Sequence, residues 1–241
     1  MAKNASVVSK LIILLIMPTP PKTIEDLMAR CNAIAGLTLG QLASSLEQAV
    51  PKNLLKDKGW VGQLIEHALG ATGGSQAVVD FADLGIELKT LPINQQGKPL
   101  ESTYVCVAPL TGVTGLEWQN SWVCEKLRHI LWLPVLAERQ IPLAERVIGN
   151  AFLWQPNSAQ QQALQQDWEE LMELISLGGI ADIRGATGKY LQLRPKAANS
   201  KALTDAIGSQ GQPIRTLPRG FYLKTNFTAA ILQQQFSLSV E

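Results

Sequence analysis

The sequence predicts a mixed α/β fold with a substantial hydrophobic core. The chain has 241 residues, of which 46% are apolar, and this suffices for one large domain or two small ones. Segments with helical periodicity alternate with short segments whose apolar residues suit strands. No internal repeat, low-complexity segment or obvious linker divides them. This alternation of helices and strands is typical of α/β proteins.

Three helices are predicted before the first strand, over residues 23–35, 38–48 and 59–69. Thr23 and Asp26 form a capping-box-like start for the first of them. Gly36 and Gly70 follow the first and the third, where glycine commonly ends a helix. Glu66 falls just beside the apolar arc of the third helix.

Strands and helices then alternate to the end of the chain. We predict strands over residues 86–91, 102–108, 130–135, 190–194 and 220–223, and helices near 121–129, over 158–177, near 200–207 and over 228–236. The helix over 158–177 has the clearest apolar stripe, through Leu164, Trp168 and Leu171, and Gly178 closes it. Its acidic stretch, which begins at Asp167, is predicted to be a solvated face.

Asp80 and the tripeptide Glu87-Leu88-Lys89 form the candidate catalytic motif. Side chains alternate across a strand, so Glu87 and Lys89 should share one face while Leu88 points into the core. Asp80 ends a short apolar stretch, and a hairpin-like return would bring it beside Glu87. Two carboxylates can hold Mg²⁺ together with waters and a substrate phosphate. The lysine can orient, or help to deprotonate, a water that attacks a phosphodiester.

The spacing of this motif leaves a second interpretation open, because charged residues two apart are also common on a solvated strand face. Glu66 adds a further candidate carboxylate, which could reach toward Asp80 across the glycine-rich loop at residues 70–74. Taken alone, these side chains do not decide between a nuclease site and a solvated edge.

The distribution of charge and the few cysteines and histidines limit the functions that the chain can have. The net charge is +1, but the stretch from Arg184 to Lys224 holds eight basic residues and one acidic residue, Asp205. Such a cluster is expected of phosphate contact, although an ordinary solvated face explains it equally well. Three scattered cysteines and two unpaired histidines argue against a disulfide framework and a zinc site. Any metal should therefore be held by oxygen, and a reducing cytoplasm fits.

Residues 1–16 are interpreted as an extension upstream of a translation start at Met17. The apolar stretch at residues 11–17 is far too short to span a bilayer, and no small-residue cleavage site follows it. Residues 17–241 would then form a single domain. A membrane-surface contact by the extension is the alternative.

Six segments extend the pattern around the catalytic motif, at residues 57–62, 80–90, 105–110, 167–172, 193–199 and 217–224. In this order, and over residues from about 23 to about 236, the chain resembles the MutH family of DNA mismatch repair endonucleases. Several long, unusual segments in the right order are far more specific than the catalytic triplet alone.

The resemblance implies a restriction-endonuclease-like fold, a mixed sheet flanked by helices, with two lobes around a DNA-binding cleft. It implies Mg²⁺-dependent nicking 5′ to the G of GATC, on the unmethylated strand of hemimethylated double-stranded DNA. MutL would stimulate the reaction once MutS has bound a mismatch. The chain would act as a monomer in the cytoplasm, with no membrane partner.

The resemblance also assigns roles to individual residues. Asp80, Glu87 and the backbone carbonyl of Leu88 would bind the metal, Lys89 would assist the attacking water, and Glu66 would lie at the metal site. Positions associated with catalytic support or DNA contact are matched by Lys58, Tyr104, Lys126, Arg194, Pro195, Lys196 and Tyr222. Arginine can bind guanine O6 and N7, and an aromatic edge can sense adenine N6 methylation. Lysines suit phosphate contact.

The chain departs from the family pattern at Tyr104, where phenylalanine is expected, and in the less basic segment at residues 121–126. Two alternative functions remain: a restriction endonuclease of the same fold that breaks both strands at GATC, and a non-catalytic DNA-binding module. A single copy of the motif favours nicking. The intact Asp80, Glu87 and Lys89 argue against the inert module.

Overall fold

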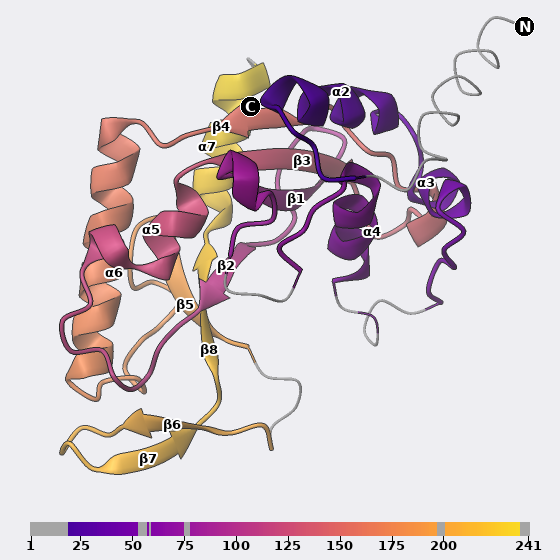
Figure 1. Ribbon diagram of the computed structural model, residues 1–241. Coiled ribbons are helices and arrows are strands. Elements are labelled where there is room, and N and C mark those ends of the chain that lie inside the picture. The colour runs from indigo at the N-terminus through magenta and orange to yellow at the C-terminus, as the bar shows by residue number, and fades with distance from the viewer. Residues whose placement is uncertain (1–18, 53–56, 58, 75–77, 197–200, 237–241) are drawn as a thin grey trace, which may run out of the picture. The chain divides into compact units, whose positions relative to one another are not determined.

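The computed structural model describes residues 19–52, 57, 59–74, 78–196 and 201–236 (Figure 1). These residues fall into two compact units. Unit 1 belongs to Met1–Leu100 and His129–Trp154, and unit 2 to Glu101–Arg128 and Gln155–Glu241. Each unit combines helices with a small sheet, which confirms the predicted mixed α/β fold. The DNA-binding cleft stays a prediction, and the predicted extension at residues 1–16 lies outside the described residues.

Unit 1 is built on a three-stranded sheet in the order β1-β3-β4. Strand β1 (Glu87–Ile93) runs parallel to β3 (Ile130–Leu136), and β4 (Phe152–Trp154) is antiparallel to β3. Leu88 of β1 and Leu131 of β3 are buried in the same core cluster as the helices of this unit. Glu87 and Lys89 of the candidate catalytic motif are therefore carried by an edge strand whose apolar side is anchored in the core.

The described α-helices of unit 1 begin within one residue of their predicted starts. They are α2 (Ile24–Ile34), α3 (Leu39–Ser45) and α4 (Trp60–Leu69). The side chain of Thr23 accepts the N–H of Asp26 at 3.1 Å before α2. Helix α3 ends before the predicted residue 48, because Glu47 adopts a left-handed backbone with φ of 54°. Gly70, with φ of 78°, ends α4 as predicted.

Unit 2 is built on an antiparallel sheet in the order β2-β8-β5. The central strand β8 (Arg219–Leu223) pairs with β2 (Thr103–Val107) on one side and with β5 (Leu191–Pro195) on the other. Phe221 and Leu223 of β8 are buried, so the alternate residues of the strand face away from the core. The predicted strands of this sheet are confirmed.

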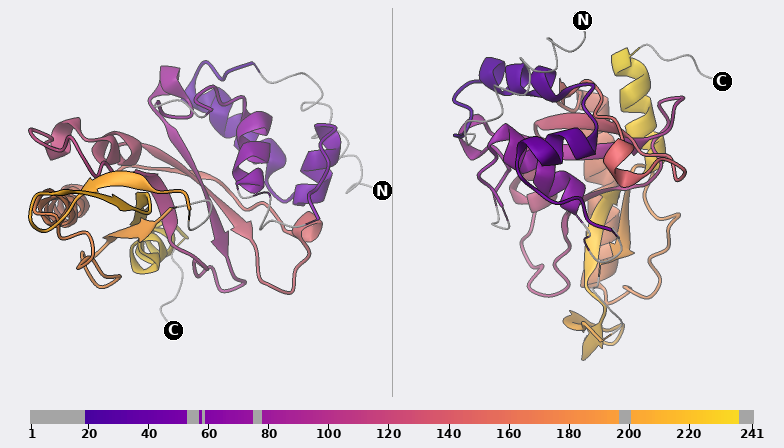
Figure 2. Two further views of the ribbon diagram at one scale, coloured as in Figure 1. Left: turned by 90° about the horizontal axis from the view of Figure 1, so that it is seen from below. Right: turned by 90° about the vertical axis from the view of Figure 1, so that its right-hand side faces the viewer.

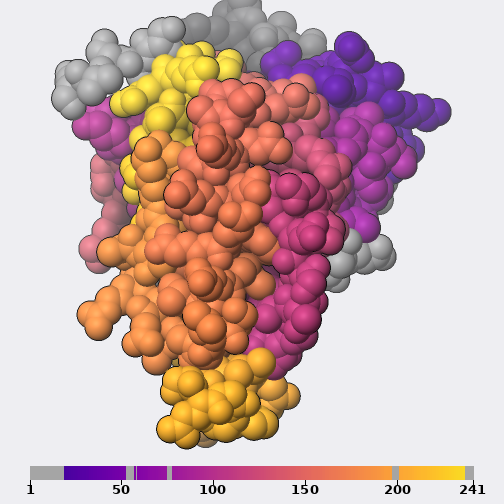
Figure 3. All heavy atoms as spheres, turned by 90° about the vertical axis from the view of Figure 1, so that its left-hand side faces the viewer, coloured from indigo at the N-terminus to yellow at the C-terminus, as the bar shows by residue number. Residues whose placement is uncertain are grey.

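Three helices belong to unit 2, namely α5 (Trp122–Leu127), α6 (Ser158–Ser176) and α7 (Thr225–Phe236). Ser121 caps α5, and Asn157 caps α6 with a capping box. Figure 3 shows α6 (orange) on one face of unit 2. The short 3-10 helices of the two units are η1 (Ala82–Leu84), η2 (Trp118–Asn120) and η3 (Leu143–Glu145). No helix in the described part of the chain is long and apolar enough to cross a membrane.

The helix predicted near residues 200–207 is wrong. Strand β6 (Thr204–Ile207) pairs instead with β7 (Pro213–Thr216) in an antiparallel hairpin, which extends away from the sheet of unit 2 (Figures 1 and 2). Its turn is closed by the N–H of Gly208, which donates to the carbonyl of Gln212 at 2.8 Å, and Gly211 takes a φ of 75°. The apolar spacing imitated a helix, whereas the two glycines are the turn signal.

The predicted solvated acidic face of α6 is wrong at its first residue. Glu169, Glu170 and Glu173 are exposed as expected, but Asp167 is only 5% exposed. Its carboxylate accepts the N–H groups of residues 189, 190 and 191 at 2.6 to 2.8 Å. Asp167 therefore fixes the start of β5 against α6, a role that helical periodicity could not indicate.

Candidate functional site

The Asp80 side chain is placed by a tight return of the chain just before β1. Phe81 and Ile86 form an antiparallel bridge, with backbone hydrogen bonds of 2.9 and 3.2 Å. Between them, η1 and Gly85 turn the chain, and Gly85 has the left-handed φ of 64° that glycine adopts most easily. The predicted hairpin-like return is therefore confirmed.

One hydrogen bond ties the Asp80 carboxylate to the outer edge of β1. The N–H of Leu88 donates to Asp80 Oδ2 at 2.8 Å. On the opposite edge, the N–H of Glu87 donates to the carbonyl of His129, just before β3, at 3.0 Å. The N–H and C=O of one strand residue point to the same edge, and successive residues alternate. The Leu88 carbonyl therefore faces the edge where Asp80 lies, and its metal contact stays a prediction.

Glu87 and Lys89 lie on the same face of β1, as the alternation predicts. Lys89 Nζ donates to Glu87 Oε1 at 2.5 Å, and the two side chains are 12% and 3% exposed. Leu88, between them, packs in the core. An unpaired charge at a buried site would destabilise the fold. The ion pair therefore keeps both side chains in place.

Asp80 is a buried carboxyl group whose pKa is raised from 3.8 to about 7. Burial is the main cause, because it disfavours the charged form, and the nearby charge of Glu87 is the second cause. The N–H of Leu88 and the charge of Lys89 lower the pKa, and the charge of Glu66 raises it slightly. Near neutral pH the protonated and the ionised forms of this carboxyl group are therefore both populated.

These groups fit a hard divalent cation. Carboxylate and carbonyl oxygens are the ligands that Mg²⁺ prefers, and Mg²⁺ commonly uses only one or two carboxylates. A cation beside Asp80 and Glu87 would offset the mutual repulsion that raises the Asp80 pKa. Within the described ranges, no three His, Cys, Asp or Glu side chains form a group that could hold a metal. The role of Glu66 at the metal stays a prediction.

Gly73 supports Asp80 from the preceding loop. The N–H groups of Thr72 and Gly73 both donate to the carbonyl of Asp80, at 2.9 and 3.1 Å. A Cβ at Gly73 would lie 2.7 Å from the carbonyl oxygen of Val79 and 2.9 Å from Cα of Asp80. The sequence placed Gly73 in a glycine-rich loop but gave no sign of this contact, since the partner is backbone.

In unit 2, four of the predicted DNA-contact side chains gather on one face of the sheet. Tyr104 and Tyr222 are cross-strand partners whose rings meet edge to face, with centroids 5.3 Å apart. The guanidinium carbon of Arg194 lies 5.7 Å from the Tyr222 centroid, and Lys196 Nζ lies 2.9 Å from the Tyr104 centroid. We call Tyr104, Tyr222, Arg194 and Lys196 the tyrosine face.

Arg194 is held on this face by a residue that the sequence did not single out. Arg194 Nη1 donates to Ser102 Oγ at 2.7 Å, while both cations of the face stay exposed. Pro195 is exposed beside Arg194 and pairs with Arg219 at the ends of β5 and β8. A lone serine before a strand carries no pattern, so only the fold reveals this contact.

The other two predicted contacts are placed differently. Lys126 lies in α5, outside the sheet that bears the tyrosine face, and is only 9% exposed. Its Nζ lies 5.6 Å from the centroid of the Trp122 ring. A DNA contact by Lys126 stays a prediction. Lys58 lies outside the described residues.

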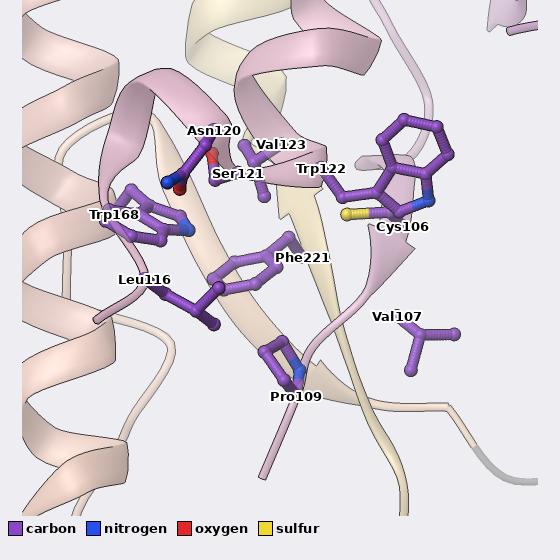
Figure 4. A pocket seen from close by; sticks show the side chains of 10 residues that line it. All are labelled: Cys106, Val107, Pro109, Leu116, Asn120, Ser121, Trp122, Val123, Trp168 and Phe221. Carbon is purple, nitrogen blue, oxygen red and sulfur yellow. The ribbon is translucent and has the colours of Figure 1, made fainter. Parts of the chain in front are cut away.

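A pocket of about 450 Å³ opens in unit 2 (Figure 4). Its lining is mainly apolar and comes from β2, the segment that follows β2, η2, α5, α6 and β8. Figure 4 shows the ten lining side chains, among them the rings of Trp122, Trp168 and Phe221. Among the residues that the structure describes, neither a predicted site residue nor any acidic or basic side chain lines the pocket. Its described lining therefore offers no carboxylate that could hold Mg²⁺.

Comparisons with known proteins identify the family. A family model described as MutH, DNA mismatch repair enzyme MutH, matches residues 69–167, which include Asp80, Glu87 and Lys89. The DNA mismatch repair protein MutH of Serratia proteamaculans (strain 568) is 57% identical over 220 residues, which cover 91% of this chain and 96% of the relative. The protein of the same name from Vibrio cholerae serotype O1 is 57% identical over 221 residues, 92% of this chain and 100% of the relative. The chain therefore belongs to the MutH family of DNA mismatch repair proteins.

Proposed function

We propose that this protein is a Mg²⁺-dependent endonuclease that nicks the unmethylated strand of hemimethylated GATC sites, 5′ to the G. It would act as a cytoplasmic monomer in methyl-directed mismatch repair, stimulated by MutL after MutS has bound a mismatch. The observation that carries the proposal is the arrangement at β1, where Asp80 is bonded to the strand that bears Glu87 and Lys89.

The residues at β1 divide the work of phosphodiester hydrolysis. Asp80 and Glu87 supply two carboxylates at β1. The N–H of Leu88 holds Asp80 at the edge of the strand, and Lys89 holds Glu87 on one face of it. A bound Mg²⁺ would stabilise negative charge at the phosphate and help to acidify a water. Lys89, fixed by Glu87, is placed to orient that water by a hydrogen bond, and its positive charge favours loss of the water's proton to solvent.

The tyrosine face supplies the groups for base recognition. Arg194 carries the fork of donors that binds guanine O6 and N7, and Lys196 can pair with a phosphate. The half-buried rings of Tyr104 and Tyr222 can contact the adenine edge, where an N6-methyl group would alter the fit. Because the sheet holds both rings in place, a methyl group on the base would meet a fixed surface.

A plasmid with one hemimethylated GATC site tests the proposal. Purified protein is incubated with the plasmid and Mg²⁺, with and without MutL, beside Asp80→Ala and the matched control Asp83→Ala. Asp83 is an exposed carboxylate only three positions away, in η1. We expect open circles that MutL increases, unchanged nicking by Asp83→Ala, and a loss of at least about 100-fold in Asp80→Ala.

Each other outcome favours a different function. Linear product would support a restriction endonuclease that cuts both strands. Binding without cutting, under every condition, would support a non-catalytic DNA-binding module. Equal activity of Asp80→Ala and the parent protein would show that the carboxylates at β1 are not the catalytic centre.

A further inference from the structure

Gly220 lies under the tyrosine face, at the centre of the sheet in unit 2. It is in the central strand β8, with Val107 of β2 and Arg194 of β5 as its cross-strand partners. The next row of the sheet on the same face holds Tyr104 and Tyr222. Both tyrosine rings can therefore lean from their own row over the backbone of Gly220.

The space above Gly220 is already filled by those rings. A Cβ at this position would lie 2.9 Å from Cε2 of Tyr104 and 3.3 Å from Cε2 of Tyr222. The third neighbour, the carbonyl oxygen of Cys106, would be 3.3 Å away. The first distance is shorter than carbon atoms tolerate, so any side chain here must displace the Tyr104 ring.

The displacement would spread through the whole face without unfolding the sheet. Lys196 Nζ sits against the Tyr104 ring and the Arg194 guanidinium over the Tyr222 ring, so both cations would follow the rings. The closest obstacle is the far end of a side chain that can rotate away. Gly220 also has no left-handed φ, and alanine can adopt its backbone conformation.

We propose that Gly220 is a positioning residue for base recognition: its missing side chain seats Tyr104 and Tyr222 in the arrangement that distinguishes methylated from unmethylated adenine. The inference rests on the proposed function and adds to it a residue that touches no DNA. Gly220 acts through the two rings and not through a contact of its own.

The seating can be measured without DNA. The chain contains three tyrosines, Tyr104, Tyr190 and Tyr222, so ring-labelled tyrosine gives a simple NMR spectrum. Gly220→Ala should shift the ring signals of Tyr104 and Tyr222 and leave Tyr190, which packs on Phe227, unchanged. The control is Gly185→Ala, where an added Cβ meets no atom within 4 Å and all three signals should stay in place.

The role in recognition is measured as a ratio of nicking rates on hemimethylated and fully methylated GATC duplexes. We expect Gly220→Ala to lower this ratio at least tenfold while thermal unfolding stays within a few degrees of the parent, and Gly185→Ala to change neither. In a Tyr104→Ala background the further effect of Gly220→Ala should be much smaller, because the displaced ring is gone.

The outcomes separate the two claims. Unshifted tyrosine signals in Gly220→Ala would overturn the seating, and shifted signals with an unchanged ratio would overturn the role in recognition. A full, additive effect in the Tyr104→Ala background would also contradict it. If the parent protein itself nicks both duplexes equally, the proposed methylation specificity fails first, and the role of Gly220 falls with it.

Discussion

At the scale of single residues, Asp80 is the most perturbed group of the site. Burial and the charge of Glu87 raise its pKa to about 7, so the folded protein binds this proton more tightly than the unfolded chain. Without metal, the ionised carboxylate is thus a cost to the fold. Catalytic carboxylates are commonly placed in such unfavourable surroundings, and a cation relieves them.

The raised pKa of Asp80 predicts how the stability of the fold depends on pH. Between pH 3.8 and about 7 the folded state binds more protons at Asp80 than the unfolded state, so its contribution to stability falls as the pH rises. Asp80→Asn removes this titration. In EDTA at pH 8, the free energy of unfolding of the variant should therefore be about 2 to 4 kcal/mol higher than that of the parent.

At pH 5 this advantage should shrink to less than half. Urea unfolding at both pH values, on parent and variant side by side, measures it, and all other titrating groups cancel in the comparison. An advantage that does not change with pH, or none at all, would show that Asp80 carries no strained charge.

Sequence and structure agree at this scale where the signal is local. Glu87 and Lys89 are two apart on a strand, so alternation alone placed them on one face. The position of Asp80 beside the start of β1 was predicted correctly, because a short return of the chain leaves few places for it. Gly73, Gly220 and Ser102 could not be predicted, because each matters through a neighbour distant in sequence or through backbone atoms.

At the scale of elements, the loop before β1 is fitted closely around Asp80. The carbonyl oxygen of Val79 and the Cα of Asp80 leave no room for a side chain at Gly73. Gly73→Ala must therefore move the backbone of Asp80 and not merely a flexible side chain. A shift of about 1 Å at a catalytic group can cost about 100-fold in rate.

We expect Gly73→Ala to lose at least about tenfold in single-turnover nicking and about 1 to 3 kcal/mol of stability. Rates on the hemimethylated plasmid and thermal unfolding report the two effects. Gly185→Ala, with open space around its added methyl group, should match the parent in both. A Gly73→Ala protein with full activity would mean that the loop does not hold Asp80.

The junction of α6 and β5 depends on one buried carboxylate. Asp167 accepts three backbone N–H groups of residues 189–191, and no periodicity signals it. Asp167→Asn turns one acceptor oxygen into a donor that faces these N–H groups. We expect a loss of about 2 to 4 kcal/mol in urea unfolding, because buried donors lose their partner.

Glu170→Gln is the matched control, since Glu170 is exposed on the same helix. Its effect should stay within about 0.5 kcal/mol. Equal stability of the two variants would show that the Asp167 contacts do not support β5.

Helices and strands were predictable in proportion to how local their signals are. The cap of α2 and the glycines after α4 and α6 act within a few residues, and α2, α3 and α4 start within one residue of the prediction. The hairpin β6–β7 was missed because its apolar spacing suits a helix, while its pairing partner lies beyond the turn. The acidic stretch of α6 failed only at Asp167, whose partners are more than twenty residues away.

At the scale of the whole molecule, the chain combines two kinds of site. The carboxylates and Lys89 belong to unit 1, and the tyrosine face belongs to unit 2. The chain belongs to the MutH family, so both sets of residues are part of one DNA mismatch repair enzyme. We therefore propose that bond cleavage takes place at β1 and methylation sensing at the sheet of β2, β5 and β8.

The most direct test of this account maps the cut on a short duplex. The duplex carries one hemimethylated GATC site, with each strand labelled at its 5′ end by a different dye. With Mg²⁺ and MutL, we expect one product, from the unmethylated strand, cut 5′ to the G, and no product in EDTA. Cleavage of the methylated strand at a similar rate, or cuts outside GATC, would contradict the account.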